Sequence, residues 1–162
     1  MSFETVAWDD PRAQALRAAM DVETTAMYAS RAAGQTPEQD AAVSAALTID
    51  PPTIVHTVLV IDDGRPVGHA ALRPWGAELE VKKVFIDESV RGRGLSRALM
   101  LELERVALER GIHSLVLQTG DRQIAAIALY ESLGYQPIEV YGAYTAIPFA
   151  LCYRKSLSLV AG

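Results

Sequence analysis

A glycine-containing loop, Arg91-Gly92-Arg93-Gly94-Leu95-Ser96, constrains the fold more than any other segment of the chain. A β-rich run at 78–86 leads towards it, and a helical pattern at 95–110 begins within it. Such a strand–loop–helix unit aims several backbone N–H groups and the positive end of a helix at one point. The two glycines permit close approach or positive φ, and the two arginines add charge that suits a pyrophosphate. The loop therefore predicts an anion site, the alternative being a tight turn with solvated arginines.

Two better-known phosphate motifs do not fit this loop. A dinucleotide fingerprint needs a small residue where Arg97 stands, and a P-loop needs the sequence Gly-Lys-Ser/Thr, which is absent. Neither a Rossmann enzyme nor a nucleoside triphosphatase is favoured.

Helical and strand patterns follow one another in a definite order. Asp10-Pro11 predicts the start of a helix that continues towards Tyr28, and Pro37 to Leu47 predicts a second helix. Three antiparallel strands are expected next, because β-branched residues flank the turn signal Asp62-Asp63-Gly64. These three strands are expected at 53–61, 66–72 and 78–86. The later expected elements are a helix at 95–110, a strand at 114–118, a helix capped by Asp121 and ending at 133, and strands near 135–140 and 149–154.

Composition limits the class of protein and its partners. A chain of 162 residues with 50% hydrophobic and 22% charged residues is typical of one globular domain, here 1–162. A net charge of -5 opposes binding to nucleic acid or to an anionic membrane, which both reward clustered Lys and Arg. The sequence lacks an apolar membrane span or a signal-like start, which predicts a cytoplasmic protein. The single cysteine, Cys152, is expected in the core, and three scattered histidines predict no metal site.

Two motifs together resemble the GNAT superfamily of acetyltransferases. The family's acetyl-CoA loop reads Arg/Gln-x-x-Gly-x-Gly/Ala, which Arg91 and Gly94 match and Ser96 departs from. The segment 123–135, QIAAIALYESLGY, is similar to the family's Asn-x-x-Ala-x-x-Leu-Tyr-Glu-x-x-Gly-Phe and is the more specific match. Gln123 stands where Asn is usual, so its side-chain amide is one carbon further from the backbone.

The resemblance implies an α+β fold of three layers, with a mixed central sheet of about six to seven strands flanked by helices. It implies acetyl-CoA as co-substrate and transfer of the acetyl group to a primary amine, without a metal. The acceptor is expected to be a small amine or amino acid, with a protein amine as the alternative. A homodimer is compatible with the family, although the sequence sets no oligomeric state. The residues expected to bind the cofactor are Val84, Phe85, Ile86, Arg91, Gly92, Arg93, Gly94, Leu95, Ser96, Arg97, Gln123 and Tyr130.

Two catalytic candidates follow from the resemblance. Tyr130 is the expected acid, because a phenol can protonate a thiolate and the family places the corresponding tyrosine beside the coenzyme A sulfur. Glu80 is the expected base, acting directly or through water. Period-two alternation puts Glu78, Glu80 and Lys82 on one face, opposite Leu79, Val81 and Phe85, so a solvent-facing row is the alternative for Glu80. A bulge in this strand would change which side chains face the cofactor.

The acceptor site is expected to involve the first two helices and the loop at 141–146. Candidate acceptor-binding residues are Glu23, Tyr28, Glu78 and Tyr144, the alternative being that they are surface and packing residues. A non-catalytic acyl-CoA binding or sensing module is the competing function, and Tyr130 argues against it because a binder needs no acid there. A protein-interaction domain without ligand is a third hypothesis.

Overall fold

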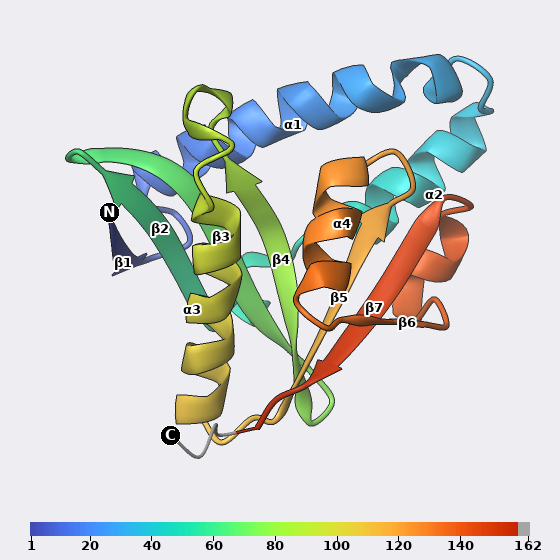
Figure 1. Cartoon of the computed structure of the whole chain (residues 1–162). Helices are drawn as coiled ribbons and strands as arrows, with labels where there is room; N and C mark the ends of the chain where they lie inside the picture. The colour runs from blue at the N-terminus through green and yellow to red at the C-terminus, as the bar shows by residue number, and fades with distance from the viewer. Residues whose placement is uncertain (159–162) are drawn as a thin grey trace.

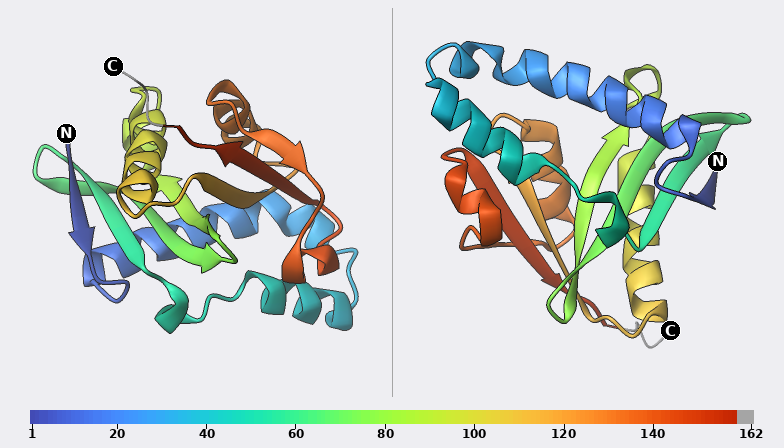
Figure 2. Two further views of the ribbon diagram at one scale, coloured as in Figure 1. Left: turned by 90° about the horizontal axis from the view of Figure 1, so that it is seen from below. Right: turned by 180° about the vertical axis from the view of Figure 1, so that it is seen from behind.

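The computed structural model describes residues 1–158, which form one mixed sheet between two layers of helices (Figure 1). The front and back views show α3 and α4 on one face of the sheet and α1 and α2 on the other (Figure 2). The helices are α1 (Pro11–Ala32), α2 (Pro37–Leu47), α3 (Leu95–Glu109) and α4 (Ile124–Ser132), and the single 3-10 turns are η1 (Pro51–Thr53), η2 (Glu88–Val90) and η3 (Gly142–Ala146). The strands are β1 (Ser2–Val6), β2 (His56–Asp62), β3 (Arg65–Trp75), β4 (Glu78–Ile86), β5 (Ser114–Gly120), β6 (Gln136–Ile138) and β7 (Ala150–Ser156).

Within residues 1–158 the sheet has seven strands in the order β1-β2-β3-β4-β5-β7-β6. Its one parallel pair is β4 with β5, and every other neighbouring pair is antiparallel. The three-layer arrangement and the mixed sheet of about six to seven strands are confirmed. No helix among residues 1–158 is both long and apolar enough to cross a bilayer.

Local signals explain where the first two helices begin. Asp10 caps α1 by accepting a hydrogen bond from the backbone N–H of Arg12 at 2.9 Å, with Pro11 in the first turn. Thr36 and Gln39 form a reciprocal capping box at the start of α2. Both predicted helix starts are confirmed.

One expectation about local structure was wrong, and one strand was not predicted at all. Asp121 does not cap α4, whose N-cap is Gln123 without a side-chain cap, because the Asp121 carboxylate instead binds Arg31 of α1 at 2.7 Å. The strand β1 was not predicted, because its five residues show no regular alternation of buried and exposed positions. It forms by antiparallel pairing with β2, a contact that no local pattern specifies.

The larger core lies between the sheet and α3. Leu99, Leu103 and Ala107 follow one stripe of α3 at four-residue spacing, and all three are fully buried. A smaller cluster lies under α1 and includes Leu16, Leu59 and Phe85. Packing on both faces leaves the centre of the sheet without solvent contact, so polar groups there need partners within the protein.

Candidate functional site

A cleft of about 750 Å³ opens where β4 and β5 separate. The two strands pair only from Leu79 to Val81 with Leu115 to Leu117, and they diverge beyond that point (Figure 1). Side chains of α1, α2, β4, β5 and α4 line the cleft, among them Arg17, Tyr28, Lys82, Gln123 and Tyr130. From residue 82 to the end of β4, the strand edge that faces β5 therefore has backbone groups without a ladder partner.

A bulge in β4 is part of the reason for this separation. Lys83 has a positive φ of 56°, and the pairing register between β3 and β4 shifts between His69 and Ala71. The ring of His69 supports the bulge, because its Nδ1 lies 2.9 Å from the carbonyl oxygen of Lys83. Its Nε2 lies 2.9 Å from Nη1 of Arg17, which can only donate, so Nε2 accepts and Nδ1 carries the proton.

Burial keeps this histidine neutral. The His69 side chain is fully buried, and desolvation lowers its pKa to about 4, helped by the nearby cations of Arg17 and Lys83 and opposed by the bond to the Lys83 carbonyl. His69 is thus fixed in one tautomer, connecting α1 to the bulge.

The bulge also reverses the side-chain alternation along β4. Leu79 and Val81 pack in the core under α3, whereas Phe85 packs with Leu16 under α1. The expectation that Phe85 shares a face with Leu79 and Val81 was wrong, because the extra residue at Lys83 shifts the two-residue period by one.

The loop after β4 presents a row of backbone donors. The N–H groups from Gly92 to Arg97 have no hydrogen-bond acceptor within residues 1–158, and the first helical carbonyl bond comes from Ala98 to Gly94. Gly92 and Gly94 have φ values of 79° and 77°, in the left-handed region that a side chain disfavours. This row of free donors at the N-terminus of α3 is the backbone arrangement that the sequence predicts for an anion site.

Ion pairs hold both loop arginines in place. Arg91 donates to the carbonyl of Ile86 at 2.9 Å and to Glu23 of α1 at 2.7 Å, and Arg93 binds Asp62 at the end of β2 at 2.7 Å. Both guanidinium groups remain partly exposed, as does Arg97 in the first turn of α3. Leu95 is buried and anchors the loop in the core, while Ser96 is half-buried.

Tyr130 and Gln123 lie on the α4 side of the cleft, as one helical stripe predicts. Tyr130 is 6% exposed and packs edge to face against Tyr135. Its hydroxyl makes no hydrogen bond to the described residues, so it is available to a ligand, and burial raises its pKa well above the ordinary value.

Glu80 lies in β4, next to the cleft-lining residues Val81 and Lys82, and belongs to a buried polar network. Its two carboxylate oxygens accept hydrogen bonds from Arg73 at 2.6 Å and from the Tyr141 hydroxyl at 2.6 Å. The Tyr144 hydroxyl accepts from Arg73 at 3.0 Å and from Lys82 at 2.5 Å. Glu80 is fully buried and Lys82 is 7% exposed, so the alternative of a solvent-facing row was wrong for this pair. The loop carrying Tyr141 and Tyr144 covers them.

The structure does not bring the four predicted acceptor-binding residues together. Tyr28 lines the cleft, where its hydroxyl accepts a hydrogen bond from the backbone of Arg122. Tyr144 is buried in the network with Lys82 and does not line the cleft. Glu23 lies at the glycine-containing loop, bound to Arg91, and Glu78 forms a two-bond ion pair with Arg154 away from the cleft lining.

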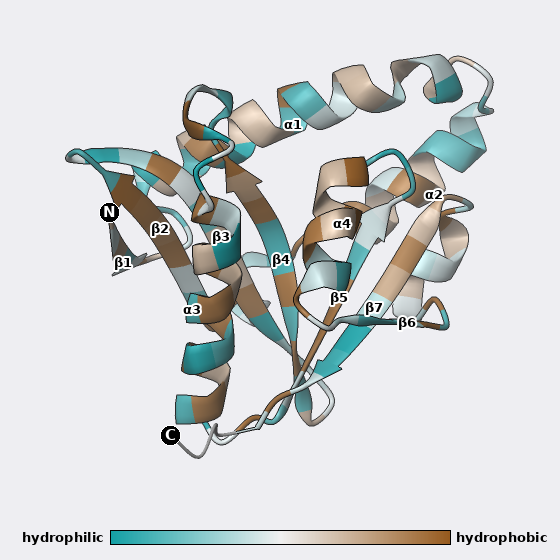
Figure 3. Cartoon of the chain, viewed as in Figure 1, coloured by the Kyte–Doolittle hydropathy of each residue, from teal (hydrophilic) through white to brown (hydrophobic). Residues whose placement is uncertain are grey.

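Sequence reasoning missed three polar residues of the cleft region: Arg17, Lys82 and Arg73. Arg17 lies within a predicted helix and Arg73 at the end of a predicted strand, and neither belongs to a motif. The one available signal was the run Lys82-Lys83 between the apolar residues Val81 and Val84, and Figure 3 shows a hydrophilic band in the middle of β4. The prediction for Cys152 is confirmed, because it is 3% exposed in a core cluster.

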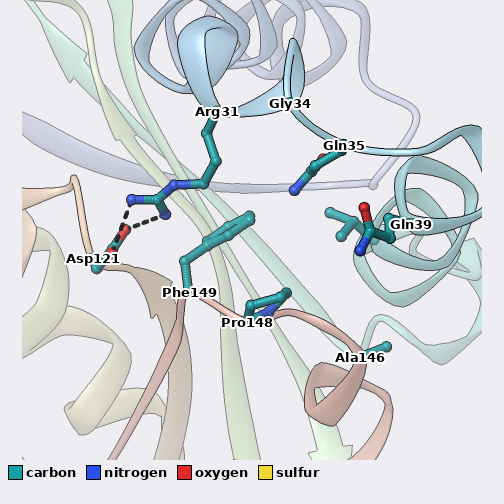
Figure 4. A pocket seen from close by; sticks show the side chains of 9 residues that line it. Arg31, Gly34, Gln35, Gln39, Asp121, Ala146, Pro148 and Phe149 are labelled. Atoms are coloured by element: carbon teal, nitrogen blue, oxygen red, sulfur yellow. Dashed lines mark hydrogen bonds and ion pairs between the residues drawn. The ribbon is translucent and has the colours of Figure 1, made fainter.

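A second, smaller cavity of about 390 Å³ adjoins the cleft and shares Val43 and Phe149 with it (Figure 4). The ion pair between Arg31 and Asp121 crosses one side of this cavity, and the Arg31 guanidinium lies 5.0 Å from the centre of the Phe149 ring. These contacts tie the end of α1 to the segment after β5. Both cavities therefore open beside the junction of α1 and α2.

Comparison with known proteins places these features in a family. The sequence model described as the Acetyltransferase (GNAT) family matches residues 15–135. The chain is 33% identical over 90 residues to IAA acetyltransferase of Azospirillum brasilense and 32% identical over 71 residues to human N-acetyltransferase 8. The matches cover 56% and 44% of this chain but only 59% and 30% of those two relatives.

Solved structures agree over nearly the whole chain. An acyl-CoA N-acyltransferase of Klebsiella pneumoniae superposes with a TM-score of 0.75 at 29% identity, covering 97% of both chains. A GNAT family acetyltransferase of Elizabethkingia anophelis, solved with acetyl-CoA bound, superposes with a TM-score of 0.67. At 15% identity, with 96% of this chain and 97% of that one covered, the second likeness shows the fold alone.

Proposed function

Because this chain belongs to the GNAT acetyltransferase family, we propose that it transfers the acetyl group of acetyl-CoA to a primary amine of a small acceptor. One observation carries the proposal: within residues 1–158 the free N–H donors at 92–97 follow the end of β4, and the hydroxyl of Tyr130, which has no hydrogen-bond partner there, belongs to the cleft where β4 and β5 separate. Acyl-coenzyme A has a pyrophosphate at the base of its pantetheine arm and a thioester at the far end of that arm, which would match an anion at the loop and a thioester near Tyr130.

The loop would hold the cofactor's pyrophosphate. Six consecutive N–H groups and two anchored arginines offer donors and positive charge without rearrangement of the loop. The pantetheine arm would lie along Val84 to Ile86, where the β5-facing edge of β4 has no strand partner, and Gln123 would contact it from α4. Phe85 itself faces the α1 side, so it would contribute backbone rather than side-chain contacts.

The reaction needs one bond to form and one to break. The neutral amine attacks the thioester carbonyl, the C–N bond forms, and the C–S bond breaks with the electron pair leaving on sulfur. A backbone N–H near Val84 would stabilise the oxyanion. Tyr130 would give its proton to the sulfur, and the burial that raises the pKa of the phenol also disfavours a thiolate beside it.

Glu80 remains our proposed acceptor of the amine proton, through a relay. Its side chain has no exposed surface, and both oxygens are engaged by Arg73 and Tyr141. A proton would therefore reach it through a network hydroxyl or a water rather than by direct contact with the amine. Because the carboxylate of Glu80 is buried and both of its oxygens are already hydrogen-bonded, the structure also favours the second candidate function, a non-catalytic acyl-CoA module, which needs no base.

Calorimetric titration with acetyl-CoA tests the cofactor site. The intact protein should bind saturably, and the double variant Arg91→Ala, Arg93→Ala should bind at least tenfold more weakly. Arg105→Ala is the matched control, because Arg105 pairs only with Glu102 and Glu109 on the exposed side of α3. Absence of binding by the intact protein would refute the proposal.

An assay of coenzyme A thiol release with a library of amines then distinguishes an acetyltransferase from a non-catalytic acyl-CoA binding module. Tyr130→Phe should retain acetyl-CoA binding and lose about 10²-fold or more in kcat. Equal turnover by the variant would remove Tyr130 as acid, and absence of turnover by the intact protein despite binding would favour the non-catalytic module.

A further inference from the structure

The charge of the cleft is opposite to the charge of the chain. The protein carries a net charge of -5, yet the charged side chains that line the cleft within the described residues are Arg17, Lys82 and Lys83 with the single carboxylate Asp21. Asp21 is 66% exposed and lies 3.7 Å from Lys83, so it offsets that lysine weakly. Arg17 and Lys82 form no ion pair within residues 1–158; Asp21 and Glu80 act on them only through space, and each of these carboxylates is paired with another cation, Lys83 or Arg73.

Lys82 is the more buried of these two cations. Its ammonium donates to the Tyr144 hydroxyl at 2.5 Å and lies 4.7 Å from the centre of that ring, and it forms no ion pair within residues 1–158. The nearby carboxylate of Glu80 is already paired with Arg73. Because a buried charge without a counter-ion is unfavourable, the pKa of Lys82 falls to about 8.

Arg17 is held towards the cleft by neutral groups alone. Its guanidinium donates to Nε2 of His69 at 2.9 Å and to the carbonyl of Trp8 at 2.6 Å, and it stacks 3.6 Å from the centre of the Trp8 ring. These contacts fix its position without neutralising its charge. His69 thereby links the position of Arg17 to the bulge at Lys83.

We infer that the acceptor is an amine that also carries a carboxylate, such as a free amino acid, and that Lys82 and Arg17 bind this carboxylate. The inference rests on the proposed function and names its substrate class. A ligand carboxylate would supply the missing counter-charge through charge-assisted hydrogen bonds. A polyamine or other multiply charged cation would instead meet cations of the same sign.

The cofactor's phosphates do not account for these two cations. The donor row at 92–97 belongs to the end of the sheet beyond β4 and to α3. Lys82 points instead to the face covered by α1, α2 and η3, where its partner Tyr144 lies in the cluster packed on α2. The two positive regions therefore serve opposite sides of the opening between β4 and β5.

Matched acceptor pairs test the inference through acetyl-CoA-dependent thiol release. Each pair is an amino acid and its decarboxylated amine: glycine and methylamine, L-leucine and isoamylamine, L-phenylalanine and phenethylamine. For at least one pair the amino acid should be used with a kcat/KM at least tenfold higher. Lys82→Met and Arg17→Gln should each reduce that ratio towards one by raising KM for the amino acid. Arg105→Gln should leave it unchanged.

A binding measurement separates failure of this inference from failure of the proposed function. With the protein saturated in coenzyme A, calorimetry with the acetylated members of the three pairs, such as N-acetyl-L-phenylalanine and N-acetylphenethylamine, should show tighter binding of the acetylated amino acid in at least one pair. Lys82→Met should abolish that difference. Turnover of the decarboxylated amines in preference to every amino acid would overturn the inference and leave the acetyltransferase intact. Equal binding of the two acetylated compounds in all three pairs would overturn it without any reference to turnover. If Arg17→Gln does not fold, the inference is still tested by Lys82→Met and by the comparison of amino acids with their decarboxylated amines in the wild-type protein.

Discussion

Lowering the pH from 7 to 5 should destabilise the protein, because the buried ring of His69 resists protonation. Its pKa is about 4 in the folded protein and about 6.5 in an unfolded chain. The unfolded state therefore binds more protons in this range, and the folded state loses stability as the pH falls from about 6.5 towards 4. At pH 5 the difference amounts to about 2 kcal/mol of the free energy of unfolding. Arg17 and the Lys83 carbonyl are the groups that face the ring.

Urea denaturation of wild type and His69→Gln at pH 7, 6 and 5 measures this effect. The variant will be less stable at pH 7, but it should lose about 2 kcal/mol less than wild type between pH 7 and 5. Subtracting the two curves removes the contribution of His56, whose pKa burial also lowers. His113→Gln is the matched control and should keep the wild-type slope. Equal slopes for wild type and His69→Gln would refute the neutral buried ring.

Three further predictions concern the loop and the buried network. Gly94→Ala should cost about 1 kcal/mol of stability, because Gly94 has a φ of 77°, and should weaken acetyl-CoA binding in a calorimetric titration. Glu80→Gln should destabilise the protein by about 3 kcal/mol in urea denaturation, because Arg73 would keep a buried charge without its counter-ion; an unchanged midpoint would contradict this. Lys82→Met should raise the free energy of unfolding by up to about 3 kcal/mol at pH 7. The gain should shrink towards pH 10, where the wild-type lysine is neutral in the fold.

The motifs at the cofactor end were readable from the sequence because local geometry determines them. A loop with glycines at 92 and 94 before a helix leaves N–H groups without acceptors wherever the chain folds in this way. The seven-residue spacing of Gln123 and Tyr130 places them on one helical stripe for the same reason. Helix starts at Pro11 and Pro37 were equally local.

The acceptor side could not be read in this way. The bulge at Lys83 reverses the alternation of β4, and its support by His69 joins residues 14 positions apart in two strands. The counter-ion of Glu80 comes from β3 and its other partner, Tyr141, from a segment 61 residues later. No local pattern encodes such pairings, so period-two alternation favoured a solvent-facing row where the protein has a buried network.

The sequence by itself determined the family, the order of the elements after β1, and the glycine-containing loop with its free N–H groups, since these depend on motifs and on residues close together in the chain. Only the tertiary structure decided which charges near the cleft are neutralised. Arg73 and Glu80 cancel each other, whereas the hydrogen-bond partners of Lys82 and Arg17 within residues 1–158 are all neutral. Whether a charge is compensated depends on distances between separate elements, and these arise only when the helices close over both faces of the sheet.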